Sequence, residues 1–279
     1  MAPWTGVVLV RGEPGDDRME SRLPTFLHPL AGRPLAWHAL AALAALQPAP
    51  RHLYLVTERE LTPDPLLDSW EGLRLVEFEG RDLRSVLASA GGTDDRVLVV
   101  DARAPLLDDA LQPLLEAPCT AVLVDADGRP AAASLSGELL DYHLGEWNGL
   151  AAVAAADVPR QVSVEGALVV RDRGTLARAS ERIRDRLVAR LMEGGVTFVL
   201  PQTVWVDLDV NIGRDSVIYP GVVLEGRTTI GEETVVGPGC RIVDSWVGSG
   251  VELKGWNYLS HTSIRNRAIL EPYARRGFD

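Results

Sequence analysis

The stretch VNIGRDSVIYPGVVLEGRTTIGEETVVGPGCRI, residues 210–242, carries a branched aliphatic residue at every sixth position. An α-helix repeats every 3.6 residues and a strand every two, so neither element produces this period. A triangular coil does, because each six-residue face then holds one short strand and one corner, with the aliphatic side chain pointing to the axis. Three faces give about eighteen residues per turn, and the stretch therefore predicts a prism of stacked coils.

The six-residue series continues beyond this stretch at both ends. Its members are Val206, Ile212, Ile218, Leu224, Ile230, Val236, Ile242, Val247, Leu253, Leu259, Ile264 and Leu270. Two steps, to Val247 and to Ile264, are five residues long, and a glycine often follows the aliphatic residue, as at Gly231. Stacked turns would bury this column continuously, so the repeats depend on one another. A meander of short strands with coincidental spacing is the alternative, which the regularity of the series disfavours.

The first two-thirds of the chain alternate differently. Four short apolar runs suit buried strands: 5–10, 51–56, 95–100 and 119–124. Helical patterns lie between them, including 34–47 with Pro34 in the favoured first turn. This alternation predicts a mostly parallel sheet with helices on both faces, and ligands of such sheets bind at the carboxyl ends of the strands.

A long helical pattern joins the two parts. It covers residues 175–195, with Thr175 as the expected cap and the glycine pair at 194–195 as the stop. The expected domains are an α/β domain over 1–174, a linking helix and connection over 175–201, and a prism of about 3.5 coils over 202–279.

Composition limits the classes of partner. The chain has 279 residues, with 28 basic against 39 acidic residues and a net charge of −11, which disfavours nucleic acid or an anionic membrane as a partner. Two cysteines, Cys119 and Cys240, make neither a disulfide framework nor a zinc site. No apolar run reaches the length of a membrane span, and the N-terminus lacks the features of a signal peptide. We expect a soluble, cytoplasmic protein.

The order of these parts resembles a known family. The most specific pieces are LP at 23–24, LHPLAGRPL at 27–35, VEG at 164–166 and the stretch 210–242. Together they resemble the bacterial bifunctional UDP-N-acetylglucosamine pyrophosphorylase/glucosamine-1-phosphate acetyltransferase family. The resemblance implies a Rossmann-like nucleotidyltransferase (GT-A-like) α/β domain, followed by a short left-handed parallel β-helix of hexapeptide repeats. It also implies a homotrimer that forms through the β-helix.

The family transfers a uridylyl group from UTP to a sugar 1-phosphate. Backbone N–H groups cradle the phosphates, basic side chains hold them, and a carboxylate positions Mg²⁺. A nucleotide or a sugar phosphate is therefore the expected ligand. The resemblance implies nucleotide binding for Gly12, Gly15, Thr25 and Gly80, a catalytic role for Arg18, and a sugar contact for Glu165.

The phosphate-binding positions depart from the family pattern. The loop GEPGDDRM, residues 12–19, is two residues longer than the family's G-x-G-T-R-M. Asp16 and Asp17 would repel a triphosphate unless a cation intervenes. The family's lysine is replaced by Thr25, which donates one hydrogen bond but carries no charge.

The metal-binding positions depart as well. The family places an aspartate two residues before the proline that corresponds to Pro105, and Arg103 stands there. Asp101, four residues before Pro105, resembles the metal ligand in the D-A-x-x-P turn of the cytidylyltransferases of isoprenoid synthesis, but it is equally suited to capping the turn. The family's second ligand, an asparagine, aligns with Arg171, and its neighbour Asp172 is the candidate replacement.

Two hypotheses follow from these departures. The substitutions at Thr25, Arg103 and Arg171 favour a nucleotidyltransferase-like protein with lost or altered uridylyltransferase activity and no cofactor. The alternative is an active nucleotidyltransferase that uses Mg²⁺ bound to Asp101. The family's acetyltransferase residues lie on later coils than those of this sequence, so no acetyltransferase activity is expected.

Overall fold

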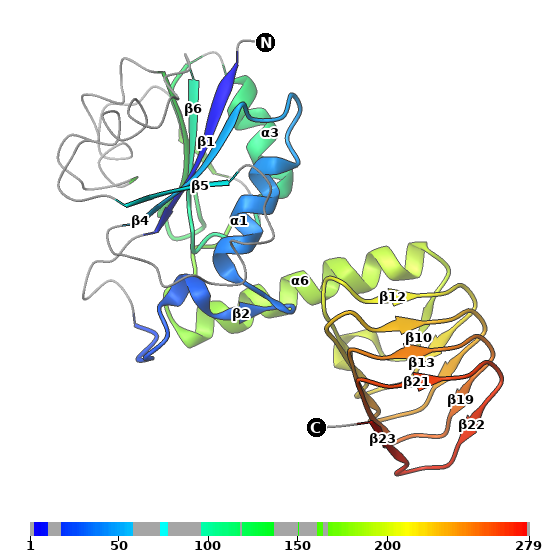
Figure 1. The fold of residues 1–279 in the computed structure, drawn as a ribbon. Helices are drawn as coiled ribbons and strands as arrows, with labels where there is room; N and C mark the ends of the chain where they lie inside the picture. Colours follow the sequence, from blue (N-terminus) through cyan, green and yellow to red (C-terminus); the bar gives the residue numbers. More distant parts are fainter. Residues whose placement is uncertain are drawn as a thin grey trace. The chain divides into compact units, whose positions relative to one another are not determined.

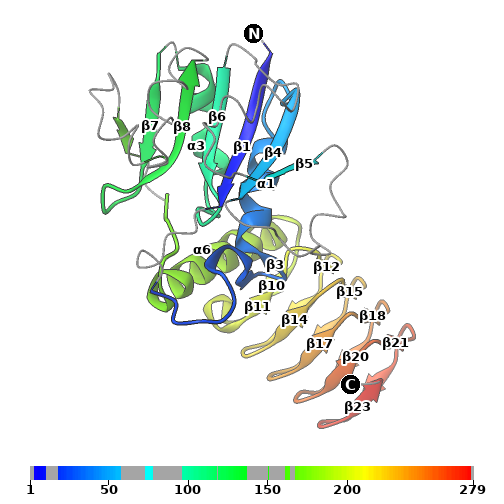
Figure 2. The same cartoon turned by 60° about the vertical axis from the view of Figure 1, so that its left-hand side comes forward.

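The computed structural model describes residues 3–10, 18–57, 73–77, 96–117, 119–136, 150, 161–163 and 167–277. The chain forms two compact units. We call them the α/β unit, residues 1–29 and 33–179, and the prism unit, residues 30–32 and 180–279 (Figures 1 and 2). Among the described residues, no helix is both long and apolar enough to cross a membrane.

A mixed sheet of seven strands forms the centre of the α/β unit. Its strands, in spatial order, are β5 (Leu73–Glu77), β4 (His52–Thr57), β1 (Trp4–Val10), β6 (Arg96–Asp101), β8 (Pro130–Ser136), β7 (Ala121–Val124) and β9 (Gln161–Ser163). Of the seven strands described here, only β8 runs antiparallel to its neighbours, so the prediction of a mostly parallel sheet is confirmed.

Two helices, α1 (Leu35–Ala44) and α3 (Asp108–Glu116), lie side by side against one face of this sheet. Leu40 and Leu43 of α1 and Leu111 of α3 pack with Val8 and Leu98 in one buried cluster. β1 is buried along its whole length, as expected for a strand that is covered on both faces. Pro34 precedes α1 as its N-cap residue, one position before the first turn where the sequence placed it.

The strand order reverses beside β1. β1 pairs in parallel with β4 on one side and with β6 on the other, and Leu9 lies opposite Asp101. The amide of Ala102 donates to the carbonyl of Leu9 (2.8 Å), which continues the pairing past the end of β6. In sheets of this type, the crevice at such a reversal is where ligands bind. The reversal therefore places Asp101 and the residues after it at the expected site.

The prism unit is built from three parallel sheets. The first holds β10 (Thr197–Phe198), β13 (Val217–Ile218), β16 (Val235–Val236), β19 (Glu252–Leu253) and β22 (Ile269–Leu270). The second holds β11 (Trp205–Val206), β14 (Val223–Glu225), β17 (Arg241–Val243), β20 (Tyr258–Ser260) and β23 (Arg275–Gly277). The third holds β12 (Asn211–Ile212), β15 (Thr229–Ile230), β18 (Trp246–Val247) and β21 (Ser263–Ile264). Figure 2 shows these short strands stacked coil above coil as a left-handed β-helix.

The predicted aliphatic column is the core of the prism. All twelve members belong to one hydrophobic cluster, eleven of them buried and Ile212 partly buried. Val206 pairs with Leu224, eighteen positions later, whereas Ile230 pairs with Val247, seventeen positions later. Each five-residue step therefore shortens a coil by one residue without moving the column, and the predicted six-residue period is confirmed.

A second inward column, not predicted from the sequence, lies two residues before the aliphatic one. Its polar members in successive coils include Ser216, Thr228, Thr234 and Ser245, all buried. The hydroxyl of Ser216 donates to the carbonyl of Gly231 (2.8 Å) and accepts from the amide of Thr234 (3.1 Å). These hydroxyls satisfy backbone groups at the corners, which burial would otherwise leave unpaired.

Glycine after the aliphatic residue has a steric reason. A β-carbon on Gly231 would lie 2.5 Å from the backbone nitrogen of Ser249 in the next coil, a contact too short for any side chain.

One short segment from the N-terminal part of the sequence, residues 30–32, also belongs to the prism unit. The carbonyl of Ala31, in the turn between β2 (Pro29–Leu30) and β3 (Arg33–Pro34), accepts from the amide of Leu208 (3.1 Å).

Candidate functional site

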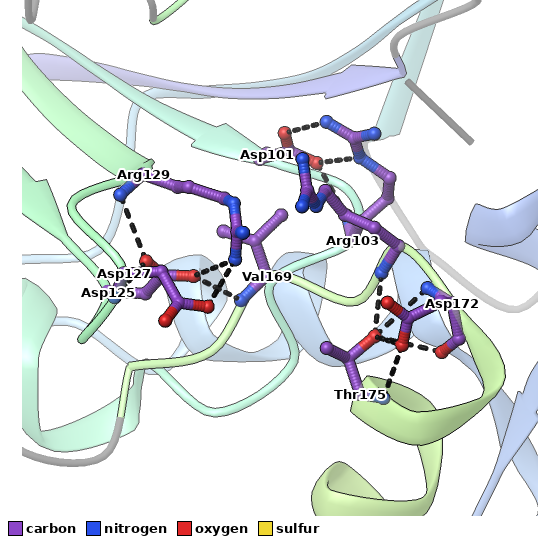
Figure 3. A network of polar contacts seen from close by, with 9 residues as sticks. Asp101, Arg103, Asp125, Asp127, Arg129, Val169, Asp172 and Thr175 are labelled. Carbon is purple, nitrogen blue, oxygen red and sulfur yellow. Dashed lines mark hydrogen bonds and ion pairs between the residues drawn. The ribbon is translucent and has the colours of Figure 1, made fainter. Parts of the chain in front are cut away.

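The candidate site lies at the carboxyl end of β6, where Arg103 holds the carboxylate of Asp101 (Figure 3). Nε of Arg103 donates to Oδ1 of Asp101 (3.0 Å), and one terminal nitrogen donates to Oδ2 (2.8 Å). Asp101 is 5% exposed and Arg103 is 6% exposed. This is a buried, bidentate ion pair, and it occupies both oxygens of the carboxylate.

The backbone after β6 fixes this pair. The amide of Arg103 donates to Oδ1 of Asp101 (2.8 Å), and the amide of Ala104 donates to the carbonyl of Asp101 (3.0 Å). Asp101 therefore makes the capping hydrogen bond that the alternative interpretation of this residue expects. The same turn brings the Arg103 side chain back over the carboxylate, because only one residue separates the two.

Two further arginines meet at this edge through their backbone. The amide of Arg18 donates to the carbonyl of Arg171 (2.9 Å), and the amide of Val170 donates to the carbonyl of Arg103 (2.9 Å). Arg18 is exposed and Arg171 is partly buried. The structure thus brings together Arg103 and Arg171, which stand at the positions where the resemblance implies metal ligands, with Arg18, the predicted catalytic arginine.

Asp172 caps the long helix α6 (Arg173–Glu193), which begins two residues earlier than predicted. Its Oδ1 accepts from the amide of Thr175 (2.7 Å), and the Thr175 hydroxyl accepts from the amide of Asp172 (3.0 Å). The prediction that Thr175 is the cap is therefore wrong. Asp172 occupies the capping position and Thr175 makes the reciprocal contact three residues later, as in a capping box. The hydrogen bonds that the amide and the hydroxyl of Thr175 donate to Oδ1 of Asp172 lower the pKa of this carboxyl below its ordinary value.

Replacing Asp172 with alanine is expected to lower the free energy of unfolding by about 1 kcal/mol, because the first turn of α6 loses its cap. Asp172→Asn should retain most of that stability, since its amide oxygen can still accept from Thr175. The folded pKa of Asp172 is depressed, so its contribution is present above the unfolded pKa and disappears as the pH falls through the folded value. Urea denaturation at pH 7 and at about pH 3 measures both effects, with Asp185→Ala on the exposed surface of α6 as control. Equal losses in Asp172→Ala at both pH values would contradict this role.

A buried carboxylate on the neighbouring hairpin was not identified from the sequence. Asp125 follows β7, is 2% exposed, and accepts from the amides of Asp127 and Arg129 (both 2.9 Å) through Oδ1. Its Oδ2 accepts from the amide of Val169 (3.4 Å) and lies 3.7 Å from Arg129. Asp125 thus ties the hairpin to the segment before Arg171. The turn signal DADG at 125–128 was available for this inference.

The remaining predicted residues divide into two groups. Thr25 lies in the short helix η1 (Thr25–Leu27) and is only 3% exposed, which limits its access to a phosphate. Gly12, Gly15, Gly80 and Glu165 lie outside the described residues, as do the aspartates at 16 and 17. Their roles stay predictions.

The described residues do not fit a divalent cation. Asp101 is held by Arg103, and Oδ1 of Asp172 is held by the helix cap. Within the described ranges, no group of three or more His, Cys, Asp or Glu side chains could hold a metal ion. Mg²⁺ is bound in proteins through one or two carboxylates together with water and phosphate oxygens, and the carboxylates of Asp101 and Asp172 already accept from protein donors.

Comparison with known proteins gives the following relatives. Residues 209–243 match the family described as bacterial transferase hexapeptide (six repeats). The bifunctional protein GlmU of Thermobifida fusca is 30% identical over 341 aligned positions, which cover 96% of this chain and 67% of the relative. GlmU of Geobacillus sp. is 40% identical over 113 residues, covering 40% of this chain and 24% of the relative. The chain thus matches about a quarter of one relative's length and two thirds of the other's.

The chain is also similar to solved structures. The structure of 4-diphosphocytidyl-2C-methyl-D-erythritol synthase is 15% identical with a TM-score of 0.47, covering 64% of this chain and 98% of that one. A CMP:2-keto-3-deoxy-manno-octonic acid synthetase in complex with CTP is 13% identical with a TM-score of 0.46, covering 66% of this chain and 100% of that one.

Proposed function

The chain belongs to the family of the bifunctional protein GlmU, and from this membership we propose that it binds a nucleotide or a sugar phosphate while its nucleotidyl transfer is lost or strongly reduced. Membership and fold make it a sugar nucleotidyltransferase-like protein. The ligand class follows from the family's chemistry and from the position of the arginines at the strand-order reversal. The homotrimer stays a prediction from the resemblance.

One observation carries the proposal, the ion pair between Asp101 and Arg103. Nucleotidyl transfer needs a cation that neutralises the developing charge on the phosphates, and a carboxylate has to position that cation. Asp101 is the described carboxylate at the right place, but both of its oxygens accept from Arg103. A buried pair of this kind does not open without leaving a charge uncompensated.

The second supporting observation concerns Thr25. The family's lysine would supply a charge-assisted hydrogen bond to phosphate, which is about twice as strong as a neutral one. Thr25 supplies no charge and is buried. Loss of both the lysine and the metal site removes two electrostatic contributions to the same transition state, so their effects combine on the rate.

Pyrophosphate release tests this proposal. The full-length chain is incubated with Mg²⁺, each nucleoside triphosphate and a panel of sugar 1-phosphates, with a GlmU that turns over under the same conditions as the positive control. We expect a rate at least about a thousandfold below that control, since several kcal/mol of transition-state stabilisation are missing. Calorimetric titration of the same protein should still detect nucleotide or sugar phosphate.

Two outcomes would contradict the proposal. Robust turnover that Asp101→Ala abolishes would establish the alternative, an active transferase with Asp101 as metal ligand. An absence of binding at millimolar concentrations of every nucleotide and sugar phosphate would remove the ligand class itself.

A further inference from the structure

The described residues of this site do not fit Mg²⁺, the cofactor of the family, because positively charged side chains stand where metal ligands are expected. A site that uses Mg²⁺ presents carboxylates, which repel phosphate until the metal binds. At the two positions where this family has metal ligands, the chain has Arg103 and Arg171 instead. Each substitution puts a positively charged side chain at a position where the family has a residue that binds a cation.

Arg103 removes the negative charge that a metal would otherwise have to neutralise. Its guanidinium donates to both oxygens of Asp101, and the two side chains are buried together. Asp172 is likewise occupied, since its carboxylate accepts from Thr175 at the start of α6. Among the described residues, both candidate metal ligands, Asp101 and Asp172, therefore already accept hydrogen bonds from protein donors.

Arg18 and Arg171 supply positive charge at the same edge. Their backbones are joined by a hydrogen bond of 2.9 Å, and the segment that ends in Arg171 is joined to Arg103 through Val170. Arg18 is exposed and Arg171 is partly buried, whereas Arg103 is buried. A guanidinium recognises phosphate oxygens through two parallel hydrogen bonds and stays charged at every physiological pH.

We propose that arginine side chains replace the divalent cation at this site, so that it binds the phosphate groups of its ligand without a metal. Arg103 neutralises Asp101, and Arg18 and Arg171 donate to the phosphates. This inference rests on the proposed function, because it assumes that a nucleotide or a sugar phosphate binds here. It goes further in giving the ionic state of that ligand, which is the free anion rather than its Mg²⁺ complex.

The test is a calorimetric titration of the full-length chain with UTP, once with EDTA and once with an excess of MgCl₂. We expect binding in EDTA with an affinity at least equal to that in MgCl₂, because Mg²⁺ withdraws negative charge from the ligand. Arg171→Asn, which restores the family's residue type, and Arg18→Gln should each weaken binding in EDTA about tenfold or more. Arg265→Gln, an exposed arginine of the prism unit, is the matched control and should bind as the wild type does.

The outcomes separate this inference from the proposed function. Binding that requires MgCl₂ would overturn the metal-free site while leaving the ligand class intact. No binding of UTP or of a sugar 1-phosphate in either buffer would overturn the proposed function and this inference with it. Wild-type affinity in both Arg171→Asn and Arg18→Gln would show that UTP binds elsewhere and would overturn the assignment. Arg18 is exposed, so its variant is informative even if Arg171→Asn fails to fold.

Discussion

Replacing Arg103 with leucine is expected to lower the free energy of unfolding of the α/β unit by about 3–5 kcal/mol, because the substitution leaves the buried carboxylate of Asp101 without its partner. Asp101 is 5% exposed, so water cannot take over the two hydrogen bonds that Arg103 donates. A loss of this size is a large part of the total stability of most domains. Urea denaturation followed by far-UV circular dichroism measures it.

The double variant Asp101→Leu/Arg103→Leu distinguishes the net contribution of the ion pair to the free energy of unfolding from the cost of leaving one buried charge without its partner. Replacing both charges with apolar residues of similar volume is often neutral or stabilising, so the double variant should recover most of the loss. Arg22→Leu, an exposed arginine of the same unit, is the control and should change stability by no more than about 0.5 kcal/mol. A loss below about 1 kcal/mol in Arg103→Leu would contradict a buried, mutually dependent pair.

Truncating Ile242 to alanine is the second substitution with a large expected effect, about 2–5 kcal/mol. Ile242 is fully buried in the aliphatic column, with Leu224 and Leu259 directly below and above it in neighbouring coils. Removing its outer carbons leaves a cavity that the coils cannot close, since their spacing is fixed by parallel hydrogen bonding on all three faces.

The same chain offers a matched control for this truncation. Ile269 lies on an outer face and is 61% exposed, so Ile269→Ala should change stability by less than about 0.5 kcal/mol. Hydrogen–deuterium exchange of peptides from residues 205–277 confines the measurement to the prism. We expect Ile242→Ala to speed exchange across several coils, because neighbouring repeats share their stability. Equal effects of the two alanine variants would contradict the assignment of the core column.

Much of the prism could be predicted from the sequence. The inward position on each face admits only an aliphatic side chain, so the period appears directly in the residues, including the five-residue steps at Val247 and Ile264. The column of Ser216 and Thr234 could not be recognised in the same way. Valine, cysteine and asparagine also occupy that position, and what its polar members share is a hydrogen bond to a neighbouring coil rather than a residue type.

The site was predicted less completely. The sequence placed Arg103 where the family has a metal-binding aspartate and offered Asp101 as a substitute ligand or a turn cap, whereas the structure joins the two side chains as partners. That outcome depends on the turn after β6, which folds the arginine side chain back onto the strand end, and on burial that makes pairing obligatory. The misplaced start of α6 has a simpler cause. Both Asp172 and Thr175 are good capping residues, and the backbone geometry selects the first of them.

The pairing distance within the prism has a kinetic consequence. Strand partners there are separated by only seventeen or eighteen positions along the chain, as with Val206 and Leu224, whereas Trp4 of the seven-stranded sheet pairs with Arg96. Closing a short loop costs less chain entropy, so the next coil can form rapidly on one that is already folded. Folding of the prism can then propagate from any coil. The seven-stranded sheet that carries the arginines forms more slowly, because its paired strands are far apart in the sequence.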